Sequence, residues 1–142
     1  MNNTQDSILY NKLTVVKVDL TDVYEEIVTL ITPTKKEITA FFWGKTFEVN
    51  KDYEIKFGFV EYPIQWEVIF SENKDKRLCL DAELDFCSYA AYGKILSINP
   101  VIADFGDIKL EIGDWTNDKN VIGEYIYYKI ERLDILEVEN CT

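Results

Sequence analysis

The chain has 142 residues, 47% of them hydrophobic, and carries a net charge of −11 at pH 7 with no histidine. Without an imidazole, neither Ser-His-Asp nor Cys-His catalysis is available, because both need a base whose pKa lies near neutrality. The sequence pI of about 4.4 also makes a phosphate backbone an unfavourable partner, so double-stranded nucleic acid is not expected to bind.

Length and composition predict one domain over residues 1–142, since a chain of this size buries roughly 68–70% of its unfolded surface. The many aromatic residues favour strands over disorder. No apolar run approaches the roughly 20 residues of a membrane span, and residues 1–7 lack the pattern of a secretory signal. We therefore expect no membrane association and a cytoplasmic location.

In chain order, residues 13–20 and 37–43 read as strands, whereas residues 22–31 are ambiguous. The apolar residues between Val23 and Ile31 have roughly helical spacing, with Thr21 as an N-cap and Pro33 after the end. The same stretch is rich in β-branched residues, which favours a strand. The sequence alone leaves both readings open.

Strict period-two alternation predicts half-buried strands over residues 53–59, 65–70 and 107–112. It is clearest over residues 77–88, where we prefer a strand to a helix beginning at Asp81 and ending at Gly93. Looser alternation adds strands at 94–99 and 125–136, and polar turn clusters separate these segments. The pattern predicts an all-β protein with at most one short helix, folded as a small barrel or sandwich.

A short internal similarity links residues 43–50 to residues 92–99. In both, an aromatic residue and Gly-Lys precede three residues, a branched apolar residue and Asn. Duplication of a half-domain and chance both explain a match of this length, and neither segment carries an established repeat signature.

The C-terminal part has a motif pattern of its own. It runs Gly93-Lys94-Ile95, then Asp104-Phe105-Gly106-Asp107, then Gly123-Glu124-Tyr125-Ile126. This series resembles the strands of an OB-fold of the S1 type. The resemblance implies an OB-like barrel in the C-terminal part, but acids stand where S1 domains carry basic residues for RNA.

Sites for metals and cofactors are not expected. The three cysteines, Cys79, Cys87 and Cys141, show no CxxC spacing and read as free thiols. The acids from Asp104 to Asp118 lack the order of an EF-hand loop, and the six glycines form no phosphate-binding loop. We accordingly predict no cofactor and no enzymatic activity.

Two features are candidates for binding. Asp81, Glu83 and Asp85 would place three carboxylates on one strand face, which is either a docking edge for a basic protein or an ordinary solvated face. Trp115 lies in a polar turn, where it would either stack on a sugar or base or seal the end of a barrel.

These features lead to two functional hypotheses. The first is an acidic protein-binding module for a basic protein, resembling immunity proteins and inhibitors that neutralise toxins or nucleases. The alternative is an OB-like binder of oligosaccharide or single-stranded nucleic acid. Edge strands and abundant tyrosine leave a homodimer open as well.

Overall fold

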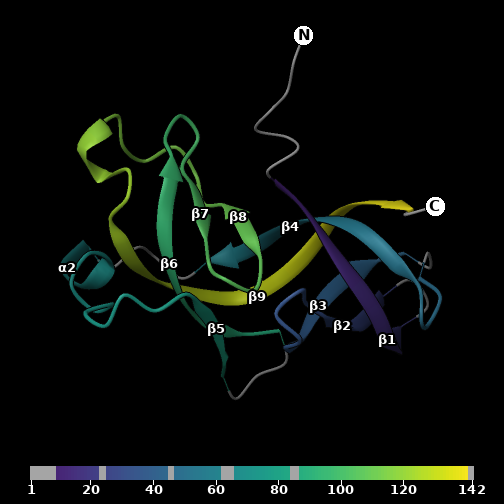
Figure 1. Cartoon of the computed structure of the whole chain (residues 1–142). Helices are drawn as coiled ribbons and strands as arrows, with labels where there is room; N and C mark the ends of the chain where they lie inside the picture. Colours follow the sequence, from purple (N-terminus) through teal and green to yellow (C-terminus); the bar gives the residue numbers. More distant parts are fainter. Residues whose placement is uncertain (1–8, 23–24, 45–46, 62–65, 84–86, 141–142) are drawn as a thin grey trace, which may run out of the picture.

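The computed structural model describes residues 9–22, 25–44, 47–61, 66–83 and 87–140, and it is an all-β, barrel-like protein (Figure 1). Its described elements are β1 (Tyr10–Asp22), β2 (Glu25–Ile31), β3 (Glu37–Trp43), β4 (Asp52–Glu61), α2 (Trp66–Ile69), β5 (Cys79–Ala82), β6 (Tyr89–Ser97), β7 (Ile102–Asp104), β8 (Lys109–Glu111), the 3-10 turn η1 (Lys119–Val121) and β9 (Tyr125–Asn140).

Five of the strands close into a ring. β1 pairs with β2 on one side and with β4 on the other, β2 pairs with β3, and β4 pairs with β9, all antiparallel. A parallel contact between Phe41 of β3 and Asp134 of β9 completes the circuit. Closing the ring leaves these strands without a long free edge.

The remaining strands extend the sheet from the first half of β9. That half pairs with β6. β6 also pairs with β5 and, further along its length, with β7, and β7 in turn pairs with β8. Figure 1 shows β9 curving from this part of the molecule into the ring. One long strand therefore connects the ring to the β5–β8 part.

Buried apolar side chains form one continuous cluster through both parts. In the ring, Leu13, Val28 and Ile55 are at most 1% exposed, and so are Leu80 and Ile95 in the β5–β8 part. Gly93 is required where β6 crosses this core, because a Cβ atom there would lie 2.5 Å from the Phe105 ring. Close approach of the backbone to Phe105 thus explains this glycine.

Most expected strands are confirmed. Residues 53–59 lie in β4 with Tyr53, Ile55 and Phe57 buried, and residues 37–43 coincide with β3. The ambiguous segment is strand: β1 ends at Asp22 and β2 starts at Glu25. β2 pairs with both β1 and β3, so its backbone groups bond to neighbouring strands rather than within a helix. Its β-branched residues favour this strand conformation.

The strand expected over residues 77–88 is much shorter in the structure than the alternating stretch of sequence that predicted it. β5 covers only Cys79–Ala82, Leu78 is 41% exposed, and residues 84–86 lie outside the described part of the chain. The helical alternative is wrong for Ala90, Ala91 and Gly93, which lie in β6.

The strand predicted over residues 65–70 is wrong, since residues 66–69 form α2, a single helical turn. Ile69 is 1% exposed, whereas Trp66 and Phe70 are 58% and 41% exposed. The alternating aromatic residues therefore do not pack inward. A six-residue alternation cannot distinguish a strand from a short turn anchored by one apolar residue.

The two similar segments do not share a conformation. Residues 92–97 belong to β6, whereas residues 47–50 follow β3 outside any strand, and residues 45–46 are outside the described part.

Candidate binding surface

Two of the three predicted docking acids lie near one another at β5, and each has a cation beside it. Asp81 accepts a hydrogen bond from Arg77 at 2.7 Å, and the Glu83 carboxylate lies 3.6 Å from Lys129 Nζ. Asp85 is outside the described residues. The structure therefore does not present these carboxylates as an unpaired acidic edge.

The pKa of the Asp81 carboxyl is lowered by its surroundings. Partial burial opposes ionisation, but the hydrogen bond and charge of Arg77, with help from Cys79 and Lys36, outweigh it. The same site raises the pKa of the Cys79 thiol, first through burial and then through the Asp81 charge. Cys79 is therefore a poor thiolate nucleophile.

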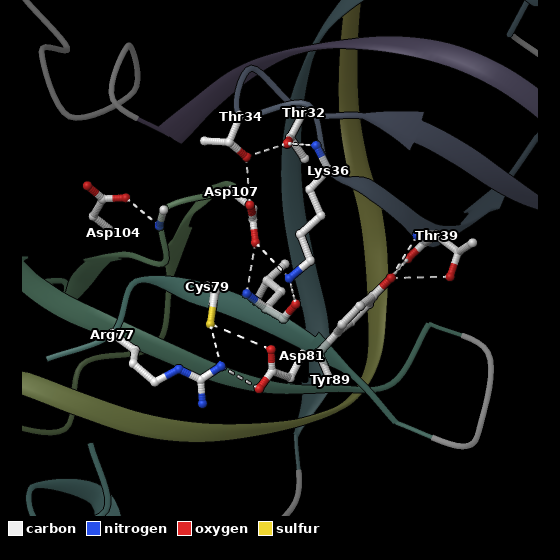
Figure 2. A network of polar contacts seen from close by, with 12 residues as sticks. Thr32, Thr34, Lys36, Thr39, Arg77, Cys79, Asp81, Tyr89, Asp104 and Asp107 are labelled. Atoms are coloured by element: carbon white, nitrogen blue, oxygen red, sulfur yellow. Dashed lines mark hydrogen bonds and ion pairs between the residues drawn. The ribbon is translucent and has the colours of Figure 1, made fainter. Parts of the chain in front are cut away.

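Behind β5 lies a buried polar network that the sequence did not reveal (Figure 2). Asp107, 6% exposed, accepts hydrogen bonds from the Thr34 hydroxyl at 2.7 Å and from the Leu80 N–H at 2.8 Å. Lys36 Nζ lies 3.3 Å from the same carboxylate and donates to the Leu80 carbonyl. These contacts provide hydrogen-bond partners for the backbone N–H and carbonyl of Leu80, and they tie the β2–β3 turn to β5.

Alternation over residues 107–112 would put Asp107 on the polar face of a strand, whereas the polar cluster Phe105-Gly106-Asp107 predicted a turn, and the turn is confirmed. β8 begins only at Lys109, so Asp107 belongs to the preceding turn and its side chain is not governed by strand alternation. The pattern over Ile108, Leu110 and Ile112 is otherwise confirmed, because all three are buried.

The tyrosine face is formed by Tyr92 of β6 with Tyr125 and Tyr127 of β9, which share one side of the sheet. The Tyr92 and Tyr127 rings lie 5.3 Å apart. Arg77 lies over Tyr92 at 4.2 Å from the ring centroid, and Lys76 and Lys94 lie over Tyr125 at 5.9 and 5.6 Å. Cations of the chain itself therefore occupy this aromatic surface.

The tryptophan cluster consists of Trp66, Phe70 and Trp115. The Trp115 ring centroid lies 5.6 Å from that of Trp66 and 6.1 Å from that of Phe70, both in edge-to-face arrangements. Trp115 is half-buried against the core and donates its indole N–H to the Ile112 carbonyl at 3.1 Å. It thus packs against the core, as one of its two expected roles requires, and also contributes a ring to an exposed cluster.

The sequence pattern indicated Trp115 as a binding residue but not Trp66 and Phe70. The signal was present as two aromatic residues four positions apart, which lie on one side of a helical turn. Their meeting with Trp115 depends on the packing of α2 beside the segment after β8, which no local pattern encodes.

A groove of about 440 Å³ lies on the outside of the ring, lined by residues from β4, β8 and β9: Lys56, Phe57, Gly58, Phe59, Glu111, Asp134 and Leu136. Asp134 is ion-paired with Arg132 at 2.7 Å, and Lys56 lies 3.9 Å from Glu137. Across the described part of the chain, no three Cys, Asp or Glu side chains are grouped to hold a metal ion. The described helices are also too short to cross a bilayer.

These observations define a small, all-β, barrel-like protein with two exposed aromatic surfaces and a strongly acidic composition. Comparison with protein-family models, with curated proteins and with solved structures finds no match in any of the three.

Proposed function

We propose that this chain is a non-enzymatic binding module whose partner is a basic protein, in the manner of an immunity protein or inhibitor that neutralises a basic toxin or nuclease. The observation that carries the proposal is an excess of acidic groups that the chain's own cations do not balance, with 26 acids against 15 basic residues.

Part of this excess lies on the outer face of the ring. Glu54 of β4 stands directly opposite Glu139 of β9, both are exposed, and among the described residues neither is ion-paired. Like charges opposite one another in a sheet destabilise it, unless a cation is bound between or beside them. Lys12 of β1 stands opposite Glu54 on its other side and offsets part of this repulsion, and a basic partner would offset the rest.

Asp81 and Glu83 fit the same proposal as secondary contacts. Their ion pairs with Arg77 and Lys129 are solvent-exposed, and such pairs contribute only about 0–1 kcal/mol. Cationic groups of a partner could therefore exchange with Arg77 and Lys129 at little cost. Asp85 belongs to the proposed contact by sequence alone.

The binding probe is a basic protein sought among the products of the neighbouring genes, here called the basic neighbour. We expect its association rate constant to fall several-fold at low salt in a Glu54→Gln, Glu139→Gln double variant, because charge steers the encounter. High salt should remove the difference. A matched control, Glu37→Gln with Glu131→Gln, removes the same charge elsewhere and should slow association less.

Two results would overturn the proposal: no binding of the basic neighbour at low salt, or association that is independent of both the substitutions and the salt concentration.

A second candidate is an OB-like binder of single-stranded nucleic acid or oligosaccharide. In its support, the ring has five strands, as an OB barrel has. When β1, β2, β3, β4 and β9 are numbered 1 to 5, their order around the ring is 1-2-3-5-4, and strands 3 and 5 are parallel. Residues 93–126, whose motifs suggested the family, contribute β6, β7, β8 and the start of β9 instead. The cations on the tyrosine face are the specific observation that favours a nucleic acid.

Titration with oligothymidylate and with neutral oligosaccharides, followed by tryptophan fluorescence, separates the two candidates. The basic-partner proposal expects no saturable change with either ligand. Saturable oligothymidylate binding that weakens in Tyr92→Ala would replace it with the second candidate.

A further inference from the structure

We infer that the tryptophan cluster is the docking site for that partner, and that it receives an arginine or lysine side chain flanked by apolar residues. This inference rests on the proposed function: it places the apolar centre of the contact at this cluster, while the acids of the ring attract the basic partner at long range. Trp, Tyr and Arg dominate the binding energy of protein interfaces, so paired exposed tryptophans are strong candidates for the centre of one.

The cluster is exposed although its three residues are aromatic. Trp66 and Phe70 are 58% and 41% exposed, while Trp115 is half-buried. Trp43 is exposed to a similar degree, at 64%, but it contacts no other ring among the described residues. Contiguous exposed rings, unlike a single one, provide an apolar surface that a partner can cover.

The rings are held in place before any partner binds. Ile69 anchors α2 in the core, and the Ser71 side chain donates to the Glu67 carbonyl at 2.8 Å. On the other side, the indole N–H of Trp115 is bound to Ile112, and Gly113 turns the chain with a φ of 105°. A surface ordered in advance loses less conformational entropy on binding.

Charge around the cluster favours a cationic side chain. In the chain, Glu67 follows Trp66, Asp114 precedes Trp115, and Glu72 follows Phe70 by two residues. All three acids are exposed and outside the described ion pairs, and Glu72 also acts electrostatically on Tyr127 of the tyrosine face. No described cation lies over the rings of this cluster. The nearby Lys76 and Arg77 lie over tyrosines instead.

The aromatic rings and the carboxylates together favour one class of partner over the others. Aromatic faces attract cations, most strongly at tryptophan, and neighbouring carboxylates add a Coulombic attraction. The same carboxylates and the net charge of −11 repel a nucleic acid or an anionic membrane surface. A second copy of this chain would bring acids against acids, which leaves a basic protein as the complementary occupant.

The experiment measures binding of a synthetic peptide in which arginine and leucine alternate, with a glutamate–leucine peptide of the same length as the negative probe. We expect the arginine peptide to change tryptophan fluorescence saturably. Trp66→Ala should weaken binding by at least about tenfold, and Phe70→Ser should weaken it in the same direction. Trp43→Ala is the matched control and should leave the affinity unchanged.

A charge variant tests whether the carboxylates beside the rings attract the cationic side chain. Glu67→Gln combined with Asp114→Asn should weaken the peptide several-fold at low salt and little at high salt. Glu37→Gln combined with Glu131→Gln, on the ring, is the matched control and should have a smaller effect. Circular dichroism confirms that each variant keeps its fold.

Three outcomes would overturn the inference. Equal binding by Trp66→Ala and the unaltered chain would place the peptide elsewhere while leaving the basic-partner proposal intact. Equal binding of the glutamate peptide would show that the tryptophan cluster does not select a cationic side chain. A dimer in sedimentation that dissociates in Trp66→Ala would make a second copy the occupant. No peptide binding together with no binding of the basic neighbour would instead reject the proposed function itself.

Discussion

The tyrosine face and the tryptophan cluster are both aromatic and partly exposed, but they differ in what lies over their rings. Arg77 and two lysines occupy Tyr92 and Tyr125, whereas no described cation covers the tryptophan cluster. Exposure of aromatic residues is thus not sufficient to mark a binding surface. A surface whose rings already hold the chain's own cations has less to gain from a cationic partner.

The two surfaces also differ in how they are built. The tyrosines lie on β6 and β9, where the strand register aligns them in rows. The tryptophan cluster joins a single helical turn to the segment after β8. Surface segments of this kind, supported by a rigid sheet, commonly carry binding residues, because they can vary without disturbing the core.

The largest expected effect tests how the tryptophan cluster is anchored. Ile69→Ala should lower the free energy of unfolding by about 2–5 kcal/mol, because it removes a fully buried side chain beneath α2. Urea denaturation measures the change. Trp66→Ala, which alters an exposed ring of the same turn, should cost no more than about 1 kcal/mol. Similar losses for both would mean that the turn is not held by Ile69.

The next effect concerns the network behind the tyrosine face. Asp107→Ala should lower the free energy of unfolding by about 3 kcal/mol, since Thr34, Leu80 and Lys36 all lose their acceptor. Denaturation of Asp114→Ala, an exposed acid, gives the control, with a change within about 0.5 kcal/mol. A loss below that of the control would show that water replaces the Asp107 carboxylate at no cost.

The smallest effect is the pH dependence of the exposed pair on the tyrosine face. Because the folded pKa of Asp81 is lowered, its ion pair with Arg77 stabilises the fold above the unfolded carboxyl pKa of about 3.9, and that contribution disappears as the pH falls through the folded pKa. Since both groups are exposed, the contribution should not exceed about 1 kcal/mol.

Asp81→Asn tests this by denaturation at several pH values. Stability should differ from the unaltered chain near neutrality, and the two should converge in acid. A constant difference across the acid range would exclude the ion pair as its source.

Strict alternation was reliable where it ran through a paired strand. β4 shows this, because the inward set from Tyr53 to Phe57 reflects burial on one face of a sheet. It failed for Trp66 and Phe70, where a short run coincides with a helical turn, and for Asp107, which precedes its strand. Of the predicted site residues, Trp115 joined a cluster, whereas Asp81 and Glu83 acquired cationic neighbours that their spacing did not reveal.

The sequence by itself determined the all-β class, the acidic charge and the exclusion of imidazole chemistry, since composition and period-two burial are local properties of the chain. Tertiary structure alone decided which strands close the ring, that Asp107 is buried beside Lys36, and that Trp66 meets Trp115. These depend on contacts between residues far apart in the chain. Such contacts form only when the strands pair and bring the intervening turns together.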